Sequence, residues 1–209
     1  MKRRPSPRSP RSGRARPLAV TVAAAGLLAL LPVTVGGQVS GEPADRDTRD
    51  GGVPDFAGHG SFRWSGMYED RALLGEAGFG VLVGERDQVG LAGVGTIRPS
   101  GYSTLDCALA YGGLRLEHEV WRRGRLATRV SLLVGGGRFT VTDTASDTEE
   151  STGVGVVEPE ARVGFRLAGP MWISVGAGYR WVAGIEGDIQ NRSDGDARGA
   201  ALIFMIGGR

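Results

Sequence analysis

Residues 153–183 alternate between apolar and polar side chains, and this stretch restricts the fold of the chain more than any other. The apolar positions of its first half are Val157, Ala161, Val163, Phe165 and Leu167. The positions between them include Glu158, Glu160, Arg162 and Arg166. Because successive side chains of a β-strand point to opposite sides, this pattern predicts a strand with one apolar and one charged face. A second strand, 171–183, repeats the pattern after a tight turn at 168–170.

The same two-residue period continues from Ser61 to the end of the chain, interrupted at intervals by turn-forming residues. The predicted strands are 61–69, 72–84, 88–98, 105–119, 126–141, 153–167, 171–183 and 197–208. In the fourth strand the apolar set changes phase at Gly112-Gly113, which predicts a β-bulge there. The last strand is too uniformly apolar for its faces to be assigned.

The predicted connections fall into two classes. Residues 85–87, 121–125 and 168–170 form short turns, whereas 142–152 and 184–196 form long, acidic loops on the other side. Short turns at one end, longer loops at the other and an even number of strands are typical of bacterial outer-membrane barrels. The sequence therefore predicts an all-β fold, an eight-stranded antiparallel up-and-down transmembrane β-barrel.

The N-terminal residues have the composition of an export signal. Seven basic residues precede a 14-residue apolar run, 18–31, which is followed by Gly36 and Gly37. This order is that of a secretory signal peptide, and the run is short for a membrane-spanning helix. We predict a signal peptide at 1–37, a flexible periplasmic lead-in at 38–60 and the barrel domain at 61–209. The alternative for the first segment is an uncleaved inner-membrane anchor.

Composition removes several functional classes. Of 25 basic residues, seven belong to the predicted signal peptide, so 18 face 23 acidic residues in the remaining chain. This acidic balance argues against a nucleic-acid partner. Cys107 is the single cysteine, which excludes a disulfide framework and a cysteine-rich metal site. We expect no cofactor and no dedicated metal centre.

Several segments resemble a small family of bacterial outer-membrane β-barrel proteins of the eight-stranded size class. The matching segments are YGGLRLEHEV, LLVGGGRF, VVEPEARVGF, SVGAGYRWVAGI and GFGVLVGERDQVGLAGVGT. Together they cover most of residues 72–208. The resemblance implies an outer-membrane barrel and supplies no catalytic residues.

A barrel of eight strands has room inside for side chains but not for an aqueous channel. The charged residues predicted to point inwards are Arg63, Glu69, Glu76, Arg129, Glu158, Glu160, Arg162, Arg166 and Arg180. Buried charges must be paired, so these residues predict an Arg/Glu network that fills the interior. Two alternatives stay open: a narrow path for protons or solutes, and a catalytic carboxylate pair at Glu158 and Glu160.

The predicted external loops carry a second set of charges. Their acidic residues are Asp143, Asp147, Glu149, Glu150, Glu186, Asp188, Asp194 and Asp196. These side chains are candidates for contact with divalent cations or with an external partner, and the alternative is a solvated loop. Among the aromatic residues, Trp64, Tyr68, Tyr179 and Trp181 are predicted to lie at the membrane interface, and Trp172 falls on the opposite face.

These patterns predict a monomeric, non-enzymatic barrel in the bacterial cell outer membrane, reached by signal-peptide-directed export. Its expected role is structural, or one of interaction in the cell envelope, with outer-membrane lipid as its surroundings. A soluble periplasmic barrel that binds a small apolar ligand is the main alternative, and it requires an apolar interior and a polar exterior. A narrow channel and a membrane-embedded enzyme are further alternatives.

Overall fold

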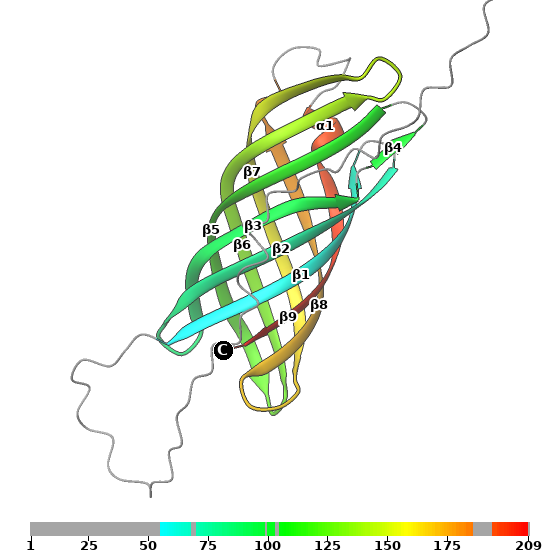
Figure 1. Cartoon of the computed structure of the whole chain (residues 1–209). Coiled ribbons are helices and arrows are strands. Elements are labelled where there is room, and N and C mark those ends of the chain that lie inside the picture. The colour runs from blue at the N-terminus through cyan, green and yellow to red at the C-terminus, as the bar shows by residue number, and fades with distance from the viewer. Residues whose placement is uncertain (1–54, 68–69, 99, 103–104, 186–193, 209) are drawn as a thin grey trace, which may run out of the picture.

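A computed structural model describes residues 55–67, 70–98, 100–102, 105–185 and 194–208 (Figure 1). The predicted signal peptide and most of the predicted lead-in lie outside these residues. The elements are β1 (Phe56–Met67), β2 (Asp70–Val83), β3 (Asp87–Arg98), β4 (Ser100–Tyr102), β5 (Leu105–Arg123), β6 (Leu126–Asp143), β7 (Thr148–Arg166), β8 (Met171–Ala183), α1 (Asp194–Ala197) and β9 (Gly199–Gly208). Within the described ranges, no helix is long and apolar enough to cross a membrane.

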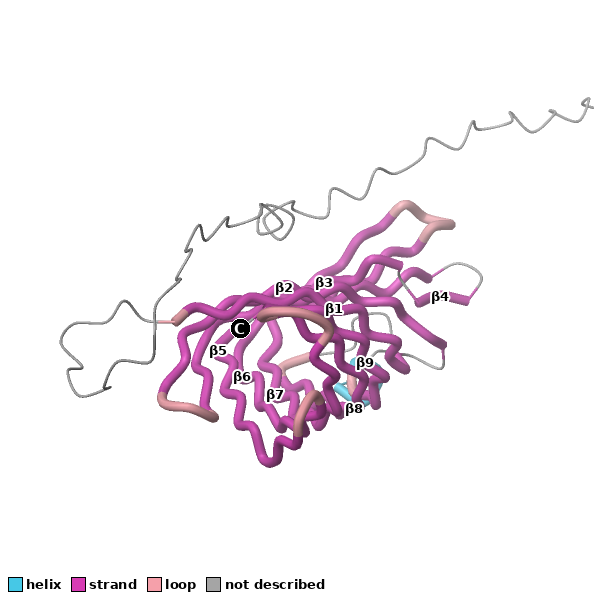
Figure 2. The backbone as a smooth tube through the Cα atoms, turned by 90° about the horizontal axis from the view of Figure 1, so that it is seen from below, coloured by secondary structure: helices cyan, strands magenta, loops and turns pink. Residues whose placement is uncertain are grey.

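The strands form one closed antiparallel barrel (Figure 1, Figure 2). Each strand pairs with the next one along the chain, except that β3 pairs with β5 and not with β4. β1 pairs with β9, and the short β4 lies along β5 beyond the segment of β5 that pairs with β3. The β3 and β4 segments therefore together occupy one of eight positions around the barrel. The predicted eight-stranded, up-and-down antiparallel barrel is confirmed.

Three predicted boundaries are corrected. The first strand begins at Phe56 rather than at Ser61. The turn after β5 shortens to Gly124-Arg125, because Gly124 adopts the left-handed conformation (φ 59°) that a tight turn needs. The predicted loop 142–152 is mostly strand, since β6 and β7 continue their ladder to the pair Asp143 and Thr148. We call the end with the β2–β3, β5–β6 and β7–β8 turns the turn end, and the opposite end the loop end.

The predicted bulge at Gly112-Gly113 is wrong. The ladder between β5 and β6 passes through this region without a break, and its irregularity lies between Glu119 and Trp121 instead. The glycines serve close approach of the two backbones: a Cβ on Gly135 would lie 2.0 Å from the carbonyl oxygen of Gly112.

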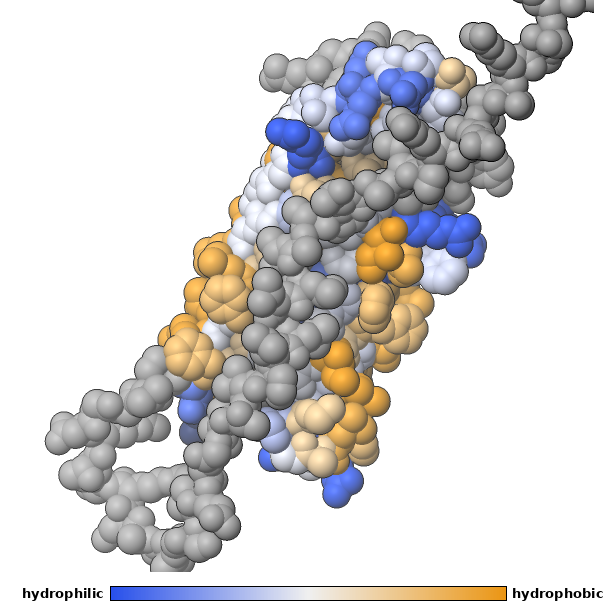
Figure 3. All heavy atoms as spheres, in the orientation of Figure 1, coloured by the Kyte–Doolittle hydropathy of each residue, from blue (hydrophilic) through white to orange (hydrophobic). Residues whose placement is uncertain are grey.

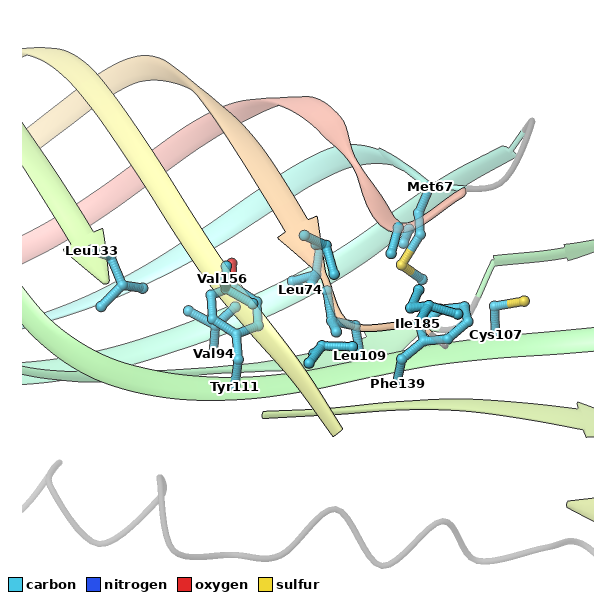
Figure 4. Packing of buried hydrophobic residues seen from close by; sticks show 14 of the residues in the cluster. Met67, Leu74, Val94, Cys107, Leu109, Tyr111, Leu133, Phe139, Val156 and Ile185 are labelled. Carbon is cyan, nitrogen blue, oxygen red and sulfur yellow. The ribbon is translucent and has the colours of Figure 1, made fainter. Parts of the chain in front are cut away.

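The barrel interior has two zones, which explains the change of phase in β5. Toward the loop end the inward side chains are apolar, including Cys107, Leu109, Phe139 and Val156 (Figure 4). Toward the turn end they are charged, beginning with Arg115 on the same face of β5. The same face of β5 thus points inwards in both zones, and only the polarity of the inward side chains differs between them. In β9, Ala201, Ile203 and Met205 point inwards.

Candidate functional site

The charged half of the interior forms one connected set of side chains, which we call the ionic cluster. Its members are His59, Ser61, Arg63, Glu76, Arg115, Glu117, Glu119, Arg129, Ser131, Glu158, Glu160 and Arg162. They come from β1, β2, β5, β6 and β7, so strands far apart in the sequence meet in the cluster.

Arg63 is the central cation. Its guanidinium contacts three carboxylates: that of Glu76, that of Glu158 at 2.6 Å and that of Glu160 at 2.5 Å. The side chains of all four residues are fully buried. Charge-assisted hydrogen bonds of this kind are strong, and they compensate for the removal of the charges from water.

Arg115 forms the second node of the ionic cluster. It lies 2.5 Å from Glu76 and 2.5 Å from Glu160, and it donates a hydrogen bond of 2.8 Å to the hydroxyl of Ser131. Glu76 also accepts a hydrogen bond of 2.6 Å from Ser61. Each of the two shared carboxylates is therefore held by two arginines and a hydroxyl, which fixes its orientation.

The part of the ionic cluster nearest the turn end is built around two further arginines. Arg162 pairs with Glu117, and Arg129 lies 3.3 Å from Glu119. The buried ring of Trp172 covers this end, with the Arg129 guanidinium 4.5 Å from the ring centroid, in the geometry of a cation–π contact. Trp172, which the sequence places on the face opposite Tyr179 and Trp181, thus packs inside the barrel.

Arg180 is buried apart from the ionic cluster, at the border of the apolar zone. It donates hydrogen bonds to the carbonyl of Ala197 (3.0 Å) and to the hydroxyl of Ser65 (3.2 Å). Its guanidinium lies 6.0 Å from the ring of Tyr111, whose hydroxyl donates to Glu158. Tyr111 thus links Arg180 to the cluster.

The structure brings most of the predicted interior residues together. Those that are buried inside the barrel are Arg63, Glu76, Arg129, Glu158, Glu160, Arg162 and Arg180. Arg166 is a correction: it is exposed where β7 ends, and its Nε donates to the carbonyl of Gly169 in the adjoining turn, so it is not a member of the network. Glu69 lies outside the described residues.

Sequence reasoning missed three charged residues of the ionic cluster, Arg115, Glu117 and Glu119. All three lie beyond the predicted bulge and are absent from the predicted set of inward charges. A signal was present, because they alternate with Leu114 and Leu116, which the predicted bulge places on the outward apolar face. With them, the described interior holds five arginines and five glutamates and is neutral without a counter-ion.

A small pocket opens beside the ionic cluster near the turn end. Its volume is about 30 Å³, and His59, Glu117, Arg129, Arg162 and Trp172 are among the residues that line it. This is space for one water molecule or a few, not for an organic ligand.

Four of the predicted external acids lie on and near the hairpin between β6 and β7. Asp143 accepts hydrogen bonds of 2.8 Å from the Ala145 amide and the Ser146 hydroxyl, and these lower the pKa of its carboxyl group. Asp147, Glu149 and Glu150 are exposed nearby.

The other predicted external acids belong to the β8–β9 connection. Asp194 accepts from the Ile185 amide at 2.9 Å and pairs with Arg198 at 3.5 Å. Glu186, Asp188 and the side chain of Asp196 lie outside the described residues. In the described part of the chain, no group of three or more His, Cys, Asp or Glu side chains is placed to hold a metal ion.

The outer surface of the barrel is apolar, in contrast to the ionic cluster inside. Large apolar side chains cover it around the barrel, as Figure 3 shows for one face. Examples are Phe62, Trp64, Phe79, Leu91, Leu114, Leu132, Val163, Ile173, Trp181 and Phe204, each at least 36% exposed. An apolar exterior around a polar interior is the arrangement of transmembrane β-barrels.

The fold is that of small outer-membrane barrels. The structure of Neisserial surface protein A (NspA) matches with a TM-score of 0.55 at 9% identity, covering 73% of this chain and 94% of NspA. Ail, the attachment invasion locus protein of Yersinia pestis, matches with a TM-score of 0.46 at 10% identity, covering 75% and 98%. The N-terminal barrel domain of Pseudomonas aeruginosa OprF matches with a TM-score of 0.46 at 12% identity, covering 73% and 96%. No protein-family model and no curated protein matches the sequence.

Proposed function

We propose that the protein is an integral outer-membrane barrel with a structural or interaction role in the cell envelope, its interior filled by the ionic cluster. The observation that carries the proposal is the inverted polarity of the barrel: large apolar side chains outside, paired charges inside. Burying such a surface in lipid removes apolar area from water, whereas an aqueous environment would leave it exposed.

The same observation argues against a soluble barrel with an apolar ligand. That function needs a polar exterior and an apolar cavity, and the barrel combines an apolar exterior with a pocket of about 30 Å³ lined partly by charged residues. The apolar part of the interior is filled by its own side chains, among them Leu74, Leu109 and Phe139 (Figure 4).

A filled interior also favours a structural role over conduction or catalysis. Glu158 is held by Arg63 and Tyr111, and Glu160 by Arg63, Arg115 and Ser131. Both carboxylates are fully buried and engaged by cations, so neither is placed to meet a substrate. The apolar zone of the interior fills the barrel between these carboxylates and the loop end.

The interaction part of the proposal concerns the β6–β7 hairpin. It carries the half-buried Asp143 and the exposed Asp147, Glu149 and Glu150, beyond the apolar part of β6 and β7. This acidic surface is suited to divalent cations or to a basic external partner.

Four assays on the full-length protein, expressed in a bacterium with an outer membrane, test the proposal. The protein is expected to co-sediment with the outer membrane, and an unheated detergent extract should migrate differently from a boiled one in gel electrophoresis, because a closed barrel resists detergent unfolding at room temperature. Release of the protein by osmotic shock would contradict the membrane location. A stable conductance in planar bilayers would contradict the filled interior.

A further inference from the structure

Three arginines project from the outer surface at the loop end of the barrel. Arg71 on β2, Arg98 on β3 and Arg138 on β6 are all exposed. Each is the first charged outward residue after the apolar series on its own strand. On β6, for example, Val130, Leu132 and Val134 face outwards before Arg138.

The register brings two of the three together. Arg98 pairs with Leu73 on β2, after a register shift between Leu73 and Leu74, and Arg71 lies two residues further along β2. Arg71 and Arg98 are therefore diagonal neighbours on one face, a spacing of roughly 7–8 Å that long side chains bridge. Arg138 extends the basic band across the barrel, three strands away from Arg71.

No intramolecular partner neutralises these charges within the part of the chain that the structure describes. The ion pairs found there do not include Arg71, Arg98 or Arg138. Other arginines at the surface do have partners: Arg122 lies 2.6 Å from Glu119, and Arg198 lies 3.5 Å from Asp194. As far as the described residues are concerned, the three charges are thus available to a ligand outside the chain.

Their position just beyond the apolar surface identifies the chemistry of that ligand. Lipid headgroups begin where the hydrocarbon layer ends, and exposed aromatic residues near the same end, Tyr179 and Trp181, are of the type found at this boundary. A guanidinium binds phosphate oxygens in a bidentate manner. We propose that Arg71, Arg98 and Arg138 bind the phosphate groups of outer-leaflet lipids. This inference rests on the proposed function, which places the loop end outwards.

The test compares the wild type with R71Q/R98Q/R138Q. The matched control is R86Q/R123Q/R125Q, which removes three exposed arginines from the turn end. Each purified barrel is titrated in neutral detergent with lipid A, a phosphorylated glycolipid, and bound lipid is counted by native mass spectrometry. The triple variant at the loop end is expected to bind about a hundredfold more weakly, since each arginine near an anionic lipid surface contributes roughly fivefold. The control variant should bind as the wild type does.

Two further ligands identify what is recognised. Dephosphorylated lipid A should bind the wild type as weakly as the intact lipid binds the triple variant, and the deacylated sugar phosphate should bind poorly because it lacks acyl chains to cover the apolar surface. Equal binding of lipid A to both triple variants, equal binding after dephosphorylation or full binding of the deacylated headgroup would overturn the inference. If both variants retain heat-modifiable mobility and outer-membrane location, such a result would leave the proposed function standing, whereas a wild type found outside the membrane would overturn both.

Discussion

Replacing Arg63 with methionine is expected to lower the free energy of unfolding by about 3–5 kcal/mol, the cost of removing one partner from a buried ion pair. The substitution leaves Glu76, Glu158 and Glu160 buried without their shared cation. Urea titration of the barrel folded into lipid vesicles measures the effect. If the variant does not fold, the loss of the fast-migrating band in unheated gels reports the same destabilisation.

A matched control separates burial of charge from loss of an arginine. Arg166→Met removes an exposed guanidinium that contacts only a turn carbonyl among the described residues, and should change stability by no more than about 0.5 kcal/mol. Adding Glu158→Gln to the Arg63→Met variant should restore part of the lost stability, since it rebalances the buried charges while Glu76 and Glu160 keep Arg115 as a partner. An Arg63 variant as stable as the Arg166 variant would show that the ionic cluster is not what holds the interior.

Leu132→Arg is expected to destabilise the barrel by about 2–4 kcal/mol, the cost of an arginine on the lipid face near the middle of the bilayer. Leu132 faces outwards on β6, midway between Leu126 at the turn and Arg138 at the loop end. The same vesicle titration measures the change. In a soluble barrel this substitution would be nearly neutral, because the side chain would lie in water.

Ala145→Arg is the control for the lipid-face substitution. It adds the same charge at the exposed tip of the β6–β7 hairpin, where it should have little effect. A large loss of stability for Ala145→Arg would contradict its position outside the bilayer, and no loss for Leu132→Arg would contradict its position on a lipid-facing surface.

The strand pattern was predictable because lipid and interior impose opposite polarities on alternate residues. In β7 this contrast is strong, so Glu158, Glu160 and Arg162 could be assigned to one face from the sequence. In β9 the contrast disappears, because the inward Ile203 and Met205 alternate with the outward Leu202, Phe204 and Ile206, which are also apolar. A strand whose inward residues are also apolar has no alternation of polarity. Its inward and outward faces can then be assigned only from its pairing with the neighbouring strands.

The errors in β5 have a different origin. The prediction assumed one polarity along the whole interior, so the inward apolar residues Cys107 to Tyr111 were assigned to the lipid face. A bulge at Gly112-Gly113 was then needed to explain the outward Leu114. The two zones of the interior and the close approach of β5 and β6 depend on all eight positions around the barrel. They therefore cannot be predicted from the residue pattern of one strand.

Tryptophan fluorescence in bilayers with brominated acyl chains tests most directly whether the apolar surface faces lipid. Three single-tryptophan proteins, with the other tryptophans replaced by phenylalanine, would retain Trp64, Trp172 or Trp181. Trp64 and Trp181 are exposed on the outer surface, and Trp172 is buried inside at 5% exposure. Brominated lipid should quench Trp64 and Trp181 strongly and Trp172 weakly. Strong quenching of Trp172, or no quenching of Trp64 and Trp181, would contradict a barrel with its apolar face in lipid and its charges inside.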